Sequence, residues 1–355
     1  MEYIKLGDIA TYINGYSFKP SDWKTEGTPI VRIQNLTGFN GNYNYTDKEV
    51  DSKYKIKRGD ILISWSASIG VYEWEGEDAF LNQHIFKVEF NKICINKQYF
   101  KYAVEQSLDK AIKFMHGSTM KHITKKYFDN ILIPVPNLEQ QEKIVKILNK
   151  AESLINMKRA QLDYQDELVK SRFVEMFGDP ITNSKKLEVT NFENVVRLQR
   201  GFDLPTYERD ISGKYNVWGS NGILSKHSNY KVNEPGIITG RSGSLGKVFY
   251  TIEPYWPLNT TLFSKETYGN NVIYLSYLLK FYKLQRFSNG TGVPTLNRNL
   301  LEGKKIINVS KNEQNKFADF VIKVDKLKFE MEKSLKELED NFNSLMQKAF
   351  KGELF

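Results

Sequence analysis

The chain has 355 residues, which is enough for two domains of ordinary size that each bury a core. Its 51 Lys and Arg against 42 Asp and Glu give a formal charge of +9, which favours an anionic partner, either nucleic acid or an anionic membrane surface. No apolar run approaches the ~20 residues of a membrane span, and the N-terminus has no signal-peptide pattern, so we expect a cytoplasmic protein without a membrane partner.

Residues 1–137 are rich in β-branched and aromatic runs, such as "ILISWS" and "IFKVEF", that are broken by Gly, Asn and Pro. This pattern predicts short strands joined by loops, with a helix over "NKQYFKYAVEQSLDKAIKFM". The single cysteine, Cys94, excludes an internal disulfide, and its apolar neighbours predict a strand or core position. We therefore expect a mixed α/β domain.

A long helix is expected directly after this domain. From Leu138 to Phe177 the chain has no Gly or Pro, and Gly178 then supplies a C-terminal cap with Pro180 just beyond. A helix of this length spans about 60 Å at 1.5 Å per residue, which is too long for a simple cap on a small domain.

The second half of the chain repeats the first half in the same order. The stretch "GDILISWSASIGVYEW" at 59–74 matches "PGIITGRSGSLGKVFY" at 235–250, and "HGSTMKHITKKYF" matches "NGTGVPTLNRNLL" at an offset of 173. This order indicates a tandem duplication and an α+β fold. The domains are then 1–137, a spacer helix at 138–178, a second domain at 179–310, and a second helix with its tail at 311–355. Matched pairs include Gly15 with Gly201, Ser66 with Ser242, Gly70 with Gly246, and Asn82 with Asn259.

The stretch "TGRSGSLGKV" at 239–248 has the small residues and the lysine of a phosphate-binding loop. The pattern fails at two positions, because Arg241 stands where the first glycine is required and Val248 stands where Ser or Thr is required. The matching loop "SWSASIGV" also has no lysine at the position of Lys247. We therefore interpret both stretches as turns between strands, each presenting one large side chain, Trp65 or Arg241.

Both long helices have an apolar seam with residues three and four apart, as in a coiled coil. The seams fall at equivalent heptad positions, so the two helices are expected to pair as an antiparallel coiled coil. Polar seam residues (Lys158, Gln165, Arg172 and Lys328) could set the register, contact another subunit or form a solvated face. The main apolar seam positions are Ile144, Leu148, Ile155, Leu162 and Val169 in the first helix, and Phe317, Val324, Met331, Leu338 and Leu345 in the second.

Together, these features resemble the DNA specificity subunits of type I restriction-modification enzymes. The resemblance is carried by "ILIPVPNLEQQEKIVKIL" at the start of the first helix, "FVEMFGDP" at its end, "LMQKAFKGEL" near the C-terminus, and the Ser/Gly turns. Asn137 replaces the second proline that usually precedes Leu-Glu-x-Gln, and the second half, "IINVSKNEQ", has neither proline.

The resemblance implies a non-catalytic subunit whose two target recognition domains each read one half of a split sequence in double-stranded DNA. It also implies that the long helices hold these domains apart and dock two methyltransferase subunits, with restriction and translocase subunits joining through the complex. S-adenosylmethionine and ATP are then expected on partner subunits, and no cofactor is expected on this chain. We find no methyltransferase tetrapeptide, Walker motif or nuclease carboxylate cluster in the sequence.

Candidate DNA contacts are residues that can pair with base edges or phosphates and that lie on the matched turns and loops. For each residue a phosphate contact remains the alternative to base reading. The candidates are Asn14, Trp65, Ser66, Lys121, His122 and Lys125 in the first half, and Arg200, Arg241, Ser242, Lys247, Thr295, Asn297 and Arg298 in the second.

Two other classes of protein stay open on the sequence alone. A coiled-coil scaffold joining two β-rich modules for sugar or protein ligands would share the repeat and the helices, and an NTPase would use "GRSGSLGK". Binding to DNA that weakens steeply with salt would separate the DNA-binding class from both.

Overall fold

The computed structural model describes residues 1–38, 43–114, 123–289 and 294–354, with the side chains of 110–114 outside these described residues. The chain divides into two compact units, Met1–Met157 with Leu335–Phe355, and Lys158–Ser334. Each unit therefore combines one sequence repeat with parts of both long helices. Within the described ranges, no helix is both long enough and apolar enough to cross a membrane.

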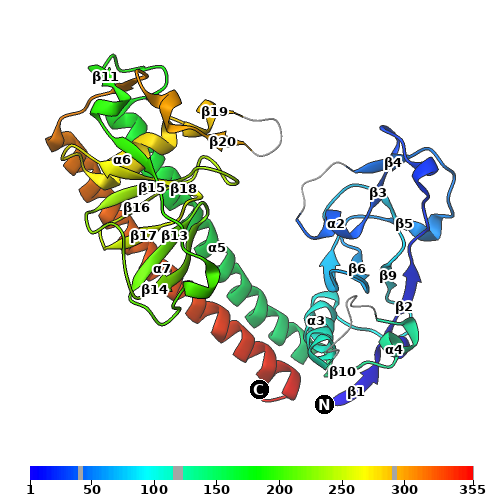
Figure 1. Ribbon diagram of the computed structural model, residues 1–355. Coiled ribbons are helices and arrows are strands. Elements are labelled where there is room, and N and C mark those ends of the chain that lie inside the picture. The colour runs from blue at the N-terminus through cyan, green and yellow to red at the C-terminus, as the bar shows by residue number, and fades with distance from the viewer. Residues whose placement is uncertain (39–42, 115–122, 290–293, 355) are drawn as a thin grey trace. The chain divides into compact units, whose positions relative to one another are not determined.

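The first repeat consists of short strands with one long and several short helices (Figure 1). Its elements in chain order are β1 (Glu2–Lys5), α1 (Leu6–Ile9), β2 (Thr11–Asn14), β3 (Thr28–Val31), α2 (Ile33–Leu36), β4 (Asn44–Thr46), β5 (Lys55–Ile56), β6 (Ile61–Ser64), β7 (Gly70–Glu73), β8 (Ala79–Leu81), β9 (Ile85–Glu89), α3 (Lys97–Phe114), α4 (Lys125–Asp129) and β10 (Leu132–Val135).

The second repeat has a closely similar set of elements. They are β11 (Val189–Asn191), β12 (Arg197–Arg200), β13 (Tyr215–Gly219), β14 (Gly222–His227), β15 (Gly236–Gly240), β16 (Val248–Thr251), β17 (Tyr255–Pro257), β18 (Thr261–Glu266), α6 (Val272–Phe281), β19 (Ser288–Asn289), β20 (Thr295–Leu296) and β21 (Lys305–Ile307).

The two repeats share most of their strand topology, which confirms the duplication and the α+β class. An antiparallel four-stranded sheet has the order β2-β9-β6-β7 in the first repeat and β12-β18-β15-β16 in the second. A second sheet in each repeat, with the order β4-β3-β8-β5 or β14-β13-β17, contains one parallel pair, β3 with β8 or β13 with β17. The first and last strands of each repeat also pair, β1 with β10 and β11 with β21.

One inner strand of each antiparallel four-stranded sheet is buried along its whole length, β6 in the first repeat and β15 in the second. All four residues of "ILIS" in β6 and all five of "GIITG" in β15 are buried, because each strand lies between two neighbours and is covered on both faces. Helix α6 packs on β15 and β16, and Phe173, Phe177 and Phe317 from the long helices complete the same core. The core thereby joins the second repeat to its part of the helices.

The long helices are α5 (Leu138–Phe177) and α7 (Lys311–Lys351). In unit 1 the start of α5 packs with the end of α7, where Ile144 and Leu148 share a core with Ala349. In unit 2 the end of α5 packs with the start of α7, where Val169 shares a core with Val324. The helices are therefore antiparallel within each unit, as predicted, and all ten main seam residues are buried or partly buried.

Polar seam residues contribute unequally to this pairing. Lys328 of α7 bonds Asp166 of α5 at 3.0 Å, and the Arg172 guanidinium lies over the Phe320 ring at 5.8 Å, so both residues link the helices. The Oε1 atom of Gln165 is buried and accepts no hydrogen bond from any described residue. These contacts support the interpretation that Lys328 and Arg172 help to set the register of α5 against α7 in unit 2.

A buried glutamine sets the turn into each long helix. Gln141 accepts a hydrogen bond from the Asn96 backbone N–H at 2.9 Å and donates to the Pro136 carbonyl at 2.8 Å. Gln314 accepts from the Asn271 N–H at 2.9 Å and donates to the Val309 carbonyl at 2.8 Å. The second turn is thus anchored as the first is, although it has no proline, because the same side chain ties both segments together.

Two sequence-based expectations are wrong. Cys94 is exposed and follows a bend, because the apolar residue that enters the core at this point is its neighbour Ile95. Asn82 is equivalent to Leu258 rather than to Asn259, since Gly15 faces the Asn82 carbonyl and Gly201 faces the Leu258 carbonyl. The two asparagines, Asn82 and Asn259, are therefore one residue out of register in the structure.

Candidate nucleic-acid interface

Residues Trp65 and Arg241 occupy equivalent, doubly anchored backbone positions. The Arg241 N–H donates to the Thr260 carbonyl at 2.9 Å, and the Arg241 carbonyl accepts from the Leu296 N–H at 2.8 Å. The Trp65 N–H donates to the His84 carbonyl at 3.2 Å, and its carbonyl accepts from the Ile123 N–H at 3.0 Å. Each turn therefore holds one large side chain on a fixed backbone.

The loop at 239–248 is a turn between antiparallel strands, as predicted. Strand β15 pairs with β16, whereas a phosphate-binding loop leads into a helix. Gly243 and Gly246 have φ angles of +79° and +86°, which explains the glycines, because residues with a side chain rarely adopt such values. This geometry therefore differs from that of a phosphate-binding loop.

Five of the candidate DNA contacts in the second repeat line one open concavity of about 790 Å³. Its floor contains the buried apolar side chains of Leu198, Leu262 and Leu296, and its walls are polar and largely basic. An open, basic surface of this kind suits a phosphate-rich ligand. The predicted residues that line it are Arg200, Arg241, Thr295, Asn297 and Arg298.

Ser242 and Lys247 do not line this concavity. Ser242 instead forms a β-bridge with Thr295, and so joins the turn to the loop before Leu296. Lys247 is exposed at the end of the turn, and its carbonyl accepts a hydrogen bond from the Thr239 hydroxyl at 2.8 Å.

Two further cations in the concavity, Arg197 and Lys265, were missed from the sequence. Arg197 is an exposed residue of β12, and Lys265 directly follows the buried run "TLFS" of β18. Alternation in "RLQR" could have indicated Arg197, since Leu198 is buried between two exposed or partly exposed polar residues. Lys265 carries no such signal, because its place beside Arg197 depends on the pairing of β12 with β18.

Aromatic packing occupies the equivalent place in the first repeat. The Trp65 indole stacks on Phe86 with ring centroids 5.7 Å apart, and its Nε1–H donates to Asn14 Oδ1 at 3.1 Å. Tyr12 and Phe128 complete this cluster, with their ring centroids 4.8 Å apart. Phe86 and Asn14 therefore hold the partly buried indole against the domain. Ser66, the next residue of this turn, is also partly buried.

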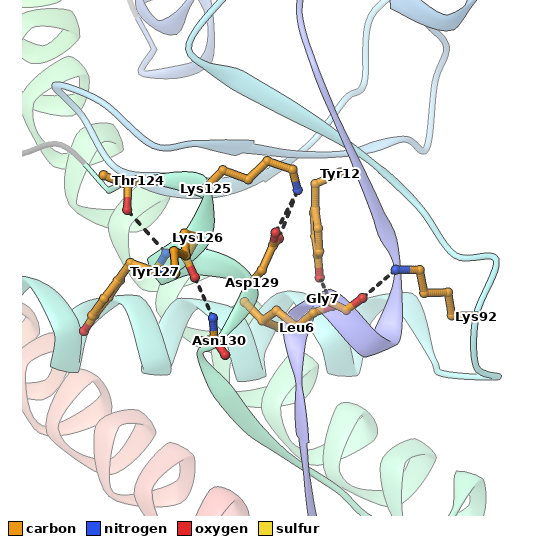
Figure 2. Close-up of polar contacts among 10 residues, drawn as sticks. All are labelled: Leu6, Gly7, Tyr12, Lys92, Thr124, Lys125, Lys126, Tyr127, Asp129 and Asn130. Atoms are coloured by element: carbon orange, nitrogen blue, oxygen red, sulfur yellow. Dashed lines mark hydrogen bonds and ion pairs between the residues drawn. The ribbon is translucent and has the colours of Figure 1, made fainter.

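The first turn of α4 contains Lys125, which is equivalent to Arg298 (Figure 2). Lys125 bonds both carboxylate oxygens of Asp129 at 3.0 Å and lies 5.7 Å from the Tyr12 ring centroid. Burial and, to a lesser degree, Asp129 raise the pKa of Tyr12, so its hydroxyl stays neutral and donates to the Leu6 carbonyl at 3.0 Å. Thr124 caps α4 by accepting from the Tyr127 N–H, as Asn297 caps Arg298–Leu301 in the second repeat. The candidates Lys121 and His122 lie outside the described residues.

Gly15 and Gly201 follow the candidates Asn14 and Arg200 and allow two chain segments to approach closely. A Cβ atom on Gly15 would lie 2.0 Å from the Asn82 carbonyl oxygen, and one on Gly201 would lie 2.3 Å from the Leu258 carbonyl oxygen. The next residues, Tyr16 and Phe202, bridge to the same segments. The closeness of this approach explains why glycine stands at the same place in both repeats.

Comparison with known proteins gives one consistent result. Residues 1–164 and 184–340 each match the family model described as "Type I restriction modification DNA specificity domain". The type I restriction enzyme MjaVIII specificity subunit of Methanocaldococcus jannaschii is 26% identical, over 99% of this chain and 76% of that protein. The type I restriction enzyme EcoBI specificity subunit of Escherichia coli is 22% identical, over 54% of this chain and 43% of that protein, less than half of its length.

Solved structures show the same fold at low sequence identity. The S subunit of a type I restriction-modification system from M. genitalium has a TM-score of 0.59 and 17% identity, covering 98% of this chain and 96% of that chain. A chain from a study of complex assembly and conformational transition in the type I R-M system has a TM-score of 0.59 and 13% identity, covering 99% and 98%.

Proposed function

Because the chain belongs to the type I restriction-modification DNA specificity family, we propose that it selects the DNA target of a type I restriction-modification complex, each repeat reading one half of a split sequence. The observation that carries this proposal is the pair of equivalent turns at Trp65 and Arg241, each on a repeat with its own core. The family match favours this function over a scaffold for sugar or protein ligands.

Catalysis is proposed to come from partner subunits. We expect the chain to be non-catalytic, with S-adenosylmethionine bound by methyltransferase subunits and ATP by the restriction and translocase subunits. The sequence supports this assignment because it lacks the motifs with which those reactions are performed.

Exposed apolar residues on the long helices support partner docking. On α5 they include Leu154, Met157, Tyr164 and Leu168, which are spaced three, seven and four residues apart and lie off the buried seam. On α7 they include Ile322, Leu327 and Phe329, each more than half exposed. Large apolar side chains on a helix surface are typical of a protein interface. We propose that two methyltransferase subunits dock here.

Methylome sequencing of the host with and without this gene tests the proposed function. We expect one methylated motif to disappear with the gene, and we expect it to be split and asymmetric, because the two turns present different side chains, Trp65 and Arg241. A continuous or palindromic motif would contradict two independent readers, and an unchanged methylome would contradict the function itself.

A further inference from the structure

The two repeats differ strongly in charge. Residues 1–137 contain 18 Lys and Arg against 16 Asp and Glu, a net charge of +2. Residues 179–310 contain 17 Lys and Arg against 10 Asp and Glu, a net charge of +7. The repeats have nearly the same number of cations, so the difference comes from the missing carboxylates of the second repeat.

The two repeats also differ in the number of ion pairs that their lysines and arginines form with carboxylates. In the described part of residues 1–137, six lysines form ion pairs with carboxylates, including Lys125 with Asp129 and Lys48 with Asp22. In the described part of residues 179–310, no such pair is found. Six lysines of the first repeat are therefore paired with carboxylates, whereas the described cations of the second repeat form no such pair.

The five cations of the concavity are Arg197, Arg200, Arg241, Lys265 and Arg298. Among the described residues, none of these side chains has an ion-pair partner. One carboxylate, Asp203, lines the concavity, and three others, Glu193, Glu266 and Glu302, lie beside its cations, but none of the four forms an ion pair with these cations among the described residues. Asp203 accepts a hydrogen bond from the Asn259 side chain, and Glu266 accepts from the backbone N–H groups of Thr267 and Tyr268. The concavity therefore keeps an excess positive charge on an open surface.

Equivalent positions in the first repeat lack this charge. Asn14 stands in place of Arg200, Trp65 in place of Arg241, and the Asp129-paired Lys125 in place of Arg298. A cation that already has a carboxylate partner gains less from a phosphate, because the existing pair must be broken and the carboxylate repels the phosphate.

We propose, building on the proposed function, that the two repeats divide the work of binding DNA. The concavity of the second repeat seats the phosphate backbone and supplies most of the salt-dependent affinity. The first repeat binds its half-site mainly through neutral and aromatic contacts, which depend little on salt. The complex is thus held on DNA by one repeat more than by the other before sequence is read.

The slope of log affinity against log salt concentration measures this division, because each phosphate contact contributes about 0.9 to the slope. The matched variants are Arg298→Gln and Lys125→Gln, which remove one cation at equivalent positions. Binding of the full chain, assembled with its methyltransferase subunits, is measured to a random-sequence duplex and to a duplex carrying the methylated motif. We expect Arg298→Gln to reduce the magnitude of the slope by about 0.9. Lys125→Gln should reduce it by less than half of that amount.

The triple variant Arg197→Gln, Arg200→Gln, Arg298→Gln extends the measurement, with an expected decrease of about 2.7 in the slope. Equal decreases for Arg298→Gln and Lys125→Gln, or an unchanged slope in the triple variant, would overturn the division of work. The single variants keep the test valid if the triple variant folds poorly. If the chain prefers the motif duplex but Arg298→Gln and Lys125→Gln change the slope equally, only this inference is refuted. If the slopes change as expected but the chain does not prefer the motif duplex, only the proposed function is refuted. If the chain does not bind DNA, both are refuted.

Discussion

Arg241 differs from the other cations of the concavity in how its backbone is held. Hydrogen bonds fix both its N–H and its carbonyl, and its side chain is partly buried, whereas Arg197, Arg200 and Arg298 are exposed. A side chain on a rigid backbone loses less entropy when it forms a directional contact. We therefore propose that Arg241 reads a base and that the exposed cations around it bind phosphates.

Replacement of Arg241 by alanine tests this assignment. Because an arginine pairs with a guanine through two hydrogen bonds, we expect Arg241→Ala to cost about 1–3 kcal/mol of binding free energy and to relax one base position in one half-site. Affinities for a set of duplexes substituted at single positions measure the effect. A uniform loss across all duplexes, with the salt slope reduced by about one, would instead assign Arg241 to a phosphate.

Glu105 of α3 is a partly buried carboxylate whose pKa is raised to about 7. Burial is the main cause, and Glu152 and Asp109 add to it, while Lys101 opposes it. The folded state therefore holds a proton that the unfolded state releases between pH 4.5 and about 7, so this group lowers stability as pH rises through that range.

The variant Glu105→Gln removes this ionisation. We expect it to stabilise the protein by on the order of 1–3 kcal/mol at about pH 8 and by much less at about pH 5, since the wild-type carboxyl is already largely protonated there. Thermal unfolding midpoints at both pH values measure the difference. Glu75→Gln, at an exposed carboxylate, is the control, and an equal stabilisation at both pH values would contradict the assignment.

At the scale of elements, close contacts between neighbouring segments preserve the fold of the two repeats despite their different sequences. Gly15 and Gly201 permit the same approach, and Gln141 and Gln314 make the same hydrogen bonds at the helix starts. These positions restrict residue type through backbone geometry, whereas Trp65 and Arg241 project from equivalent anchored positions and are free to differ.

Gly15→Ala and Gly201→Ala are each expected to destabilise the protein by about 1–3 kcal/mol, because the added Cβ would overlap a backbone carbonyl that must move. Lower thermal unfolding midpoints should show this, with Ser17→Ala at a nearby exposed position as the control. An unchanged midpoint in either variant would mean that the close approach is not required for stability in that repeat.

At the scale of the whole molecule, we propose that the paired helices set the distance between the two half-sites. The bond between Lys328 and Asp166 places these residues at one level of the antiparallel pair, so Ala160 of α5 and Lys333 of α7 lie at nearly the same level. Insertions at these two points lengthen both helices together and preserve the apolar seam.

Inserting one heptad after Ala160 and one after Lys333 lengthens the pair by about 10 Å, or about three base pairs of DNA. We expect methylation to move to a motif with a correspondingly longer gap and unchanged half-sites, since no reading turn is altered. A three-residue insertion is the control, because it displaces the seam and should weaken folding or docking. Methylation at the original spacing would show that partner subunits, rather than the helices, position the repeats.

The sequence alone determined the features that depend on periodicity and order. Apolar residues three and four apart predicted the seams of both long helices, from Ile144 to Val169 and from Phe317 to Leu345. A helix brings residues with this spacing onto one face whatever surrounds it. The matched order of Gly15 with Gly201 and Ser66 with Ser242 predicted the duplication, and the broken phosphate-loop pattern predicted a turn between strands, which the pairing of β15 with β16 confirms.

Only the tertiary structure decided what surrounds each candidate side chain. The equivalent positions Trp65 and Arg241 acquire different environments, since Phe86 and Asn14 pack against the first and an open basic concavity surrounds the second. Lys125 and Arg298 likewise differ because only Lys125 is paired with a carboxylate. Phe86 and Asn14, which contact Trp65, come from other strands, so the role of Trp65 depends on three-dimensional contacts that a local pattern does not contain, whereas Asp129 lies only four residues from Lys125 on the same helix.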